Sequence, residues 1–168
     1  MSKGQGRARL PEAGEGKRGE AGHLGYLLRQ AAHAHRIRVD HALADLGLTQ
    51  PQFAVLTMLA AYPGQSNADL ARLALLTPQT MSVIVANLLK AGLVARKPHK
   101  VHGRIQTLAL TEEGQRQIRA AKARVYDLEA LMLGPLSDTE DGVIRRWLVR
   151  VATGPDAAEE PSPDRAGD

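Results

Sequence analysis

The sequence contains no cysteine among its 168 residues, and aromatic residues make up only 3% of it. A disulfide and an oxidant-sensing thiol are therefore excluded. Hydrophobic residues amount to 43%, so aliphatic side chains must fill the core of a globular protein. No apolar run approaches the length that spans a bilayer, and the N-terminal residues lack the apolar core of a signal peptide. We expect a cytoplasmic protein with no membrane association.

Features that mark enzymes are also missing. The sequence shows no nucleophile–base pairing, no metal-ligand spacing and no cluster of acids. Its glycine-rich residues 4–22 follow no strand, so they do not form a dinucleotide-binding fingerprint. We expect neither an enzyme nor a bound cofactor.

The charge is unevenly distributed along the chain. The net charge is +4, but residues 21–152 hold 16 basic and 10 acidic residues. Such a basic excess fits a nucleic-acid partner, although an anionic membrane surface would also suit it. Residues 1–20 are rich in Gly, Arg, Lys and Glu, and residues 153–168 hold five acidic residues. We expect both tails to be disordered around one domain.

Residues 66–111 are the most informative stretch and predict two short helices followed by a hairpin. Ser66 and Asp69 have the spacing of a capping box at the start of the first helix. Thr77 caps the second helix, and Gly92 ends it. The apolar face of the second helix consists of Met81, Ile84, Val85, Leu88 and Leu89. Two helices joined by a tight turn form a helix-turn-helix, in which the second helix reads DNA.

The pattern after Gly92 is extended. Residues 93–97 run into Pro98, which disfavours helix before it, and β-branched residues return over 105–110. The chain carries five basic and no acidic residues from position 90 to position 104: Lys90, Arg96, Lys97, Lys100 and Arg104. Alone, this charge run would indicate a solvated basic hairpin. Beside a helix-turn-helix it indicates the wing of a winged helix that contacts a phosphate backbone.

Longer helices are predicted on both sides of this core. One runs over 21–46 until Gly47, and another follows over 48–61 with Thr49 as its N-cap. A third runs from Thr111 to about residue 133. A last helix, over 137–152, starts at a capping box formed by Ser137 and Glu140. The first helix carries four of the six histidines: His23, His33, His35 and His41. These have no i, i+4 pair, so a metal site is disfavoured, whereas a pH-dependent contact stays open.

Three segments resemble the multiple antibiotic resistance regulator (MarR) family of winged-helix transcription factors. They are Thr77-Pro78-Gln79-Thr80, Leu88-Leu89-Lys90-Ala91-Gly92-Leu93-Val94 and Leu108-Ala109-Leu110-Thr111-Glu112-Glu113-Gly114. The resemblance covers 21–152 and implies a mainly α fold with a small β-hairpin wing, flanked by dimerisation helices at 21–47 and 112–152. The family's wing motif Asp-x-Arg has Arg104 in its arginine position, which the resemblance places in the minor groove. His102 stands where the family has aspartate.

The predicted DNA-contacting residues come from the second helix and the wing. Gln and Asn side chains can pair with adenine, and Val83 can contact a thymine methyl. The reading helix carries no arginine, so phosphate affinity should come mainly from the wing. The full set is Thr77, Gln79, Thr80, Ser82, Val83, Asn87, Lys90, Lys97, Lys100, His102 and Arg104.

The resemblance also implies a homodimer on double-stranded DNA with a palindromic operator, and a small-molecule effector that releases a repressor. The effector would bind between the dimerisation helices and the winged helix, and its candidate contacts are Tyr26, Gln30, His33 and His41. The flanking helices would also fit an ordinary intramolecular bundle. Two alternative functions stay open: a metal- or pH-responsive regulator that uses the histidine-rich first helix, and a winged-helix protein-interaction module.

Overall fold

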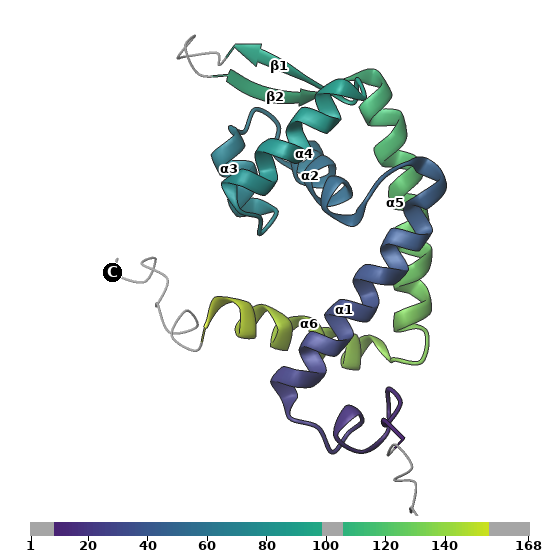
Figure 1. Cartoon of the computed structure of the whole chain (residues 1–168). Coiled ribbons are helices and arrows are strands. Elements are labelled where there is room, and N and C mark those ends of the chain that lie inside the picture. The colour runs from purple at the N-terminus through teal and green to yellow at the C-terminus, as the bar shows by residue number, and fades with distance from the viewer. Residues whose placement is uncertain (1–8, 99–105, 155–168) are drawn as a thin grey trace, which may run out of the picture. The chain divides into compact units, whose positions relative to one another are not determined.

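The computed structural model describes residues 9–98 and 106–154 (Figure 1). These residues are mostly helical and include a two-stranded antiparallel sheet, which confirms the expected fold class. The elements in chain order are the 3-10 turn η1 (Gly16–Arg18), α1 (Leu24–Leu43), the 3-10 turn η2 (Ala44–Leu46), α2 (Gln50–Ala61), α3 (Asn67–Leu73), α4 (Pro78–Lys90), β1 (Val94–Pro98), β2 (Gln106–Leu110), α5 (Glu112–Leu133) and α6 (Asp138–Thr153).

The helix starts lie where the side chains can satisfy the first backbone amides. Ser66 and Ser137 form reciprocal capping boxes with the third residue of α3 and of α6, as predicted. Thr49 caps α2, and its box is completed by Gln52. The histidine-rich helix is shorter than expected, because its last residues tighten into η2 before Gly47, whose φ of 65° is left-handed.

Helices α3 and α4 form the helix-turn-helix. Their axes are bent by 109° at the turn between them, within the range of this motif. Leu75 in that turn has a φ of 55°, a left-handed conformation that is uncommon for a residue with a Cβ, and its side chain is 93% exposed. No single helix in the described residues is long and apolar enough to cross a membrane.

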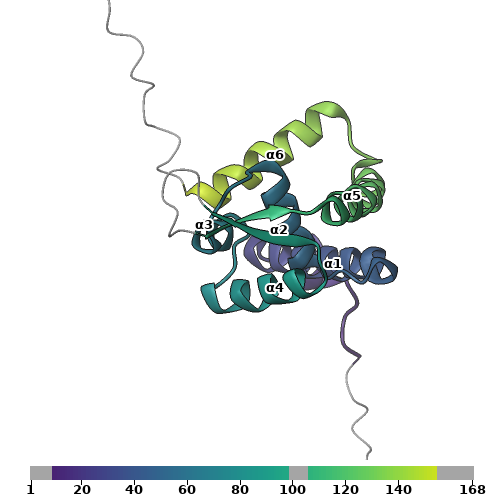
Figure 2. The ribbon, with the colours of Figure 1, turned by 90° about the horizontal axis from the view of Figure 1, so that it is seen from above.

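The hairpin pairs Val94 with Leu110 and Pro98 with Gln106. Strand β1 lies against α4 and β2 against α2 (Figures 1 and 2). The amide of Leu108 also donates a hydrogen bond of 3.3 Å to the carbonyl of Gln65, which ties the hairpin to the loop before α3. The hairpin is thus tied to the helix-turn-helix through the middle of β2.

An aliphatic core connects these elements. Its fully buried members come from α1, α2, α3, α4, the hairpin and α5, and the largest are Leu43, Leu56, Leu59, Leu70, Met81, Leu88 and Leu108. Phe53 packs against this core and is partly buried. The chain divides into a unit that ends at Leu128 and a second unit that starts at Glu129 and contains α6.

The segment before α1 differs from the expectation of a disordered arm over 1–20. Residues 9–22 are described and fold into turns around η1, held by hydrogen bonds such as Gly14 N to the carbonyl of Arg18. The glycines of this segment allow tight turns, and Arg18 forms hydrogen bonds with Gln30 of α1. Residues 1–8 and 155–168 of the two predicted tails lie outside the described residues.

Candidate nucleic-acid interface

Helix α4 has one buried side and one exposed side. The buried side carries Met81, Ile84, Val85 and Leu88 at helical spacing and packs into the core. The exposed side carries Ala86 and the helix residues predicted to contact DNA: Gln79, Thr80, Ser82, Val83, Asn87 and Lys90. Burial of the first set fixes the rotation of α4 about its axis, so the second set must face outward.

Hydrogen bonds at the start of α4 orient its first turn. The Thr77 hydroxyl accepts the amide of Thr80 at 3.2 Å, and the two threonine hydroxyls lie 2.9 Å apart. The Ser82 hydroxyl donates to the carbonyl of Pro78 at 2.9 Å, so its oxygen keeps lone pairs that can accept from a base. Val83 is 62% exposed and presents its methyl groups to solvent.

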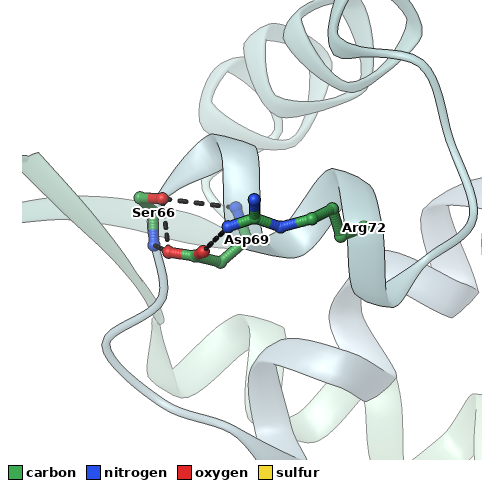
Figure 3. Close-up of polar contacts among 3 residues, drawn as sticks. All are labelled: Ser66, Asp69 and Arg72. Atoms are coloured by element: carbon green, nitrogen blue, oxygen red, sulfur yellow. Dashed lines mark hydrogen bonds and ion pairs between the residues drawn. The ribbon is translucent and has the colours of Figure 1, made fainter.

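A cluster of three polar residues stabilises the start of α3, the first helix of the helix-turn-helix (Figure 3). The Ser66 hydroxyl donates to one oxygen of Asp69 at 2.6 Å, and Arg72 donates to the other at 2.5 Å. The hydroxyl bond first, and the guanidinium second, lower the pKa of Asp69. Asp69 is therefore ionised at neutral pH. Its negative charge lies in the first turn of α3, where it interacts favourably with the helix dipole.

Strand β1, which packs against α4, carries two exposed cations, Arg96 and Lys97. From Thr77 to Pro98 the chain contains no acidic residue. The exposed surface of α4 and β1 is therefore neutral or positive, as a phosphate-facing surface requires. The predicted contacts Lys100, His102 and Arg104 lie outside the described residues.

The four candidate effector residues lie along α1. The Tyr26 hydroxyl and the Gln30 side chain are 3.4 Å apart, and both are half-buried. His33 and His41 are exposed further along the same helix. Gln30 also bonds to Arg18, a partner that the sequence reasoning did not include. The effector assignment of these four residues stays a prediction.

The described residues of the histidine-rich helix do not form a metal-binding cluster. There, no three side chains of His, Cys, Asp or Glu are placed to share an ion. His33 and His41 are both exposed, and two turns of helix separate them.

Helix α5 is held against the end of α1 by polar contacts that periodicity did not reveal (Figure 1). Arg124 pairs with Asp45 and also donates to the carbonyl of Ala42 at 3.3 Å. Gln117 donates to the carbonyl of Leu46 at 2.5 Å. The hydrogen bond from Arg124 lowers the pKa of Asp45. These contacts join a flanking helix to the winged-helix core within the first unit.

A helix-turn-helix with an exposed polar second helix, followed by a basic hairpin, defines the chain as a winged-helix protein of the DNA-binding class. Known proteins agree with this class. A family model described as the MarR family matches residues 46–105. The HTH-type transcriptional repressor Rv2887 of Mycobacterium tuberculosis is 38% identical over 130 residues, which cover 77% of this chain and 94% of that protein.

Solved structures extend the comparison. Structures of Rv2887 with DNA and with p-aminosalicylic acid each align at 36% identity and a TM-score of 0.63, over 77% of this chain and 97% and 98% of theirs. The PcaV transcriptional regulator of Streptomyces coelicolor, solved with its natural ligand, aligns at 29% identity and a TM-score of 0.68, over 81% of this chain and 96% of that one. The chain belongs to the MarR family of winged-helix transcriptional regulators, as the sequence motifs predicted.

Proposed function

We propose that this protein is a transcriptional repressor that binds a palindromic operator as a homodimer and is released by a small-molecule ligand. The observation that carries the DNA-binding part is the outward side of α4. It holds hydrogen-bonding and methyl-bearing side chains without a carboxylate, and the strand packed against α4, β1, carries two exposed cations. The structure of Rv2887 with DNA supports the same use of this fold.

In the proposed complex the two parts of the surface have different tasks. Gln79 and Asn87 would pair with base edges, and Val83 would contact a thymine methyl in the major groove. Lys97, together with Lys100 and Arg104 of the wing, would contact phosphates or the minor groove. Base contacts would set the sequence, and cation contacts would supply most of the salt-dependent affinity.

Homodimerisation is supported by α6, considered by itself. None of its residues is buried, although it carries a run of apolar side chains. Val143, Val149 and Val151 are 53%, 61% and 49% exposed. Apolar surface of this kind is stabilised by a second copy, and a two-fold dimer would place two reading helices on half-sites about one helical turn apart, roughly 10 bp.

The effector part rests on the family. PcaV and Rv2887 are each solved with a small molecule, and these complexes support a ligand for this chain as well. Tyr26, Gln30, His33 and His41 remain the candidate contacts. A ligand that binds more tightly to the DNA-free dimer would weaken operator binding by the same coupling free energy.

The test is selection from a random duplex library by the full-length protein at two salt concentrations. We expect a palindrome, and an affinity that falls steeply as salt rises. A folded dimer that selects no sequence, even after extraction of small molecules, would contradict the proposal and favour a protein-interaction module. Arg104→Ala then tests the wing, because an unchanged operator affinity would remove Arg104 from the contact set.

A further inference from the structure

A groove of about 430 Å³ lies between the end of α2, the hairpin and the first half of α5. Its volume is in the range of small-molecule sites. None of the candidate effector residues on α1 lines it. The predicted effector site therefore does not account for this groove.

The groove lies on the side of α5 that faces away from α1. Gln115, Arg119 and Lys122 line it, and their i, i+4, i+7 spacing places them on one helix face. Gln117 and Arg124, which bond to η2 and the end of α1, lie on the opposite face of the same helix. The two sides of α5 therefore serve different neighbours.

Three cations line the groove: Lys97 from β1, and Arg119 and Lys122 from α5. No acidic residue lines it, and none of the ion pairs formed among residues 9–98 and 106–154 includes these three side chains. Like charges gathered over low-dielectric walls focus a positive potential into the groove. This potential attracts an anion.

The remaining walls are mainly aliphatic. They include Leu59 and Pro63 from the α2 end, Leu110 from β2 and Ile118 from α5. Ile118 is 4% exposed and forms the edge of the core. A bare inorganic anion would leave these walls wet, whereas an anion with an apolar body would cover them.

We propose that this groove binds an amphiphilic organic anion. The three cations hold its charged head, in which the Arg119 guanidinium can pair with two oxygens of a carboxylate or phosphate. The apolar body lies on the aliphatic walls. A carboxylate and a phosphate ester share this chemistry, and the experiment below separates them.

Occupation of the groove would oppose DNA binding, and this step rests on the proposed function. Lys97 is both a groove residue and a predicted phosphate contact. An anion seated beside it would neutralise the charge that a DNA phosphate needs, so the two ligands would weaken each other by the same factor. The groove would thus be a second effector site, separate from the one predicted on α1.

The site is tested without DNA by titrating the full-length protein with octanoate, octyl phosphate and octanol in a calorimeter. We expect octanoate or octyl phosphate to bind and octanol to bind at least about tenfold more weakly, because octanol lacks the charge that the cations recognise. The tighter of the two anions identifies the head group. Failure of both anions to bind, or equal binding of octanol, would overturn the proposal.

Variants locate the binding. The double variant Arg119→Gln, Lys122→Gln should weaken the bound anion at least about tenfold. Arg116→Gln is the matched control, since Arg116 lies on the same helix outside the groove and pairs with Glu113. Circular dichroism verifies that all three proteins are folded. Unchanged affinity in the double variant would place the anion elsewhere and overturn the assignment.

Operator binding separates this proposal from the proposed function. In the absence of anion, the double variant should bind the operator like the unaltered protein, and only the unaltered protein should lose operator affinity when the bound anion is added. A tenfold loss of operator affinity in the anion-free double variant would instead assign Arg119 and Lys122 to DNA phosphates. Binding of the anion without any DNA binding by the protein would leave the groove intact and refute only the repressor function.

Discussion

Arg18 and Gln30 exchange two hydrogen bonds across the gap between η1 and α1. The Arg18 Nε donates to the Gln30 Oε1 at 3.2 Å, and the Gln30 Nε2 donates to the carbonyl of Arg18 at 2.9 Å. The Tyr26 hydroxyl donates to the same Oε1 at 3.4 Å. Any effector that uses Gln30 must therefore replace bonds that already hold residues 9–22 against α1.

The first prediction concerns this contact. Arg18→Ala removes one bond of the pair and also a bond of 2.8 Å to the carbonyl of Pro11, so residues 9–22 should detach from α1. Since each of the two lost hydrogen bonds contributes about 1 kcal/mol, amide exchange in residues 16–22 should accelerate roughly thirtyfold while the global melting temperature stays unchanged. Hydrogen exchange with mass spectrometry measures the exchange in residues 16–22, and thermal unfolding measures the melting temperature. Arg36→Ala, at an exposed position of α1, is the control, and equal exchange in the two variants would refute the role of Arg18.

Gly114 is required where α5 passes the hairpin. A Cβ built at this position would lie 2.0 Å from the carbonyl oxygen of Leu93, a backbone atom that cannot move alone. Gly114→Ala should therefore push α5 off the hairpin and cost about 3 kcal/mol of unfolding free energy or more. Gly25→Ala is the matched control: its Cβ would meet nothing within 4 Å, so helix propensity should leave it neutral or slightly stabilised. Urea unfolding measures the stability of both variants. Similar midpoints would contradict the close approach of Gly114 to the Leu93 carbonyl.

The sequence predicted those features of the fold that depend on local chemistry and periodicity. Capping side chains such as Ser66, Thr77 and Ser137 identify helix starts because they satisfy backbone amides within the same few residues. The buried and exposed sides of α4 follow from the 3.6-residue period alone. Four of the five residues predicted for the apolar face of α4 are buried, and the fifth, Leu89, is partly buried against the core.

Features that depend on distant residues could not be predicted in this way. Arg124 lies 79 positions from Asp45, and Lys97 joins Lys122 only because the hairpin folds against α5. Arg119 and Lys122 are three positions apart in the sequence and so share one helix face, but a charged helix face is ordinarily exposed to solvent and does not by itself indicate a binding site. Only the aliphatic walls that the fold adds make this face a groove.

The Ser66 cap should stabilise the helix-turn-helix. Ser66→Ala removes the acceptor for the Asp69 amide and the 2.6 Å donor to its carboxylate. Loss of such a cap costs about 1 kcal/mol, and Ser66→Thr should restore most of it. Thermal unfolding monitored by circular dichroism measures the difference. Equal melting temperatures for the serine, alanine and threonine proteins would show that the cap contributes nothing.

Reading and anchoring residues should differ in their salt dependence. Asn87→Ala should weaken binding to the selected operator by about 1–3 kcal/mol and relax the preference at one base position. Lys97→Gln should weaken binding to all sequences and reduce the slope of log affinity against log salt by about 1. Fluorescence anisotropy across a salt series on matched and scrambled duplexes distinguishes the two. If Asn87→Ala weakened both duplexes alike, its assignment as a base contact would be wrong.

Acid should weaken the attachment of α5 to the end of α1 through Asp45. The hydrogen bond from Arg124 holds the pKa of Asp45 below its ordinary value of 3.8, so the pair stabilises the fold above that pH and loses its effect as the pH falls through the folded-state pKa. The Asp45 side chain is 64% exposed, which keeps the contribution small. Arg124→Gln should therefore melt slightly below the unaltered protein at pH 7, and the difference should shrink below pH 3.8.

The pKa values of Asp69 and Glu140 are also lowered by their capping serines, but both groups titrate in either protein, so the difference between the two melting curves isolates Asp45. A gap that stays constant down to roughly pH 2.5 would show that Arg124 acts only through its bond to the Ala42 carbonyl.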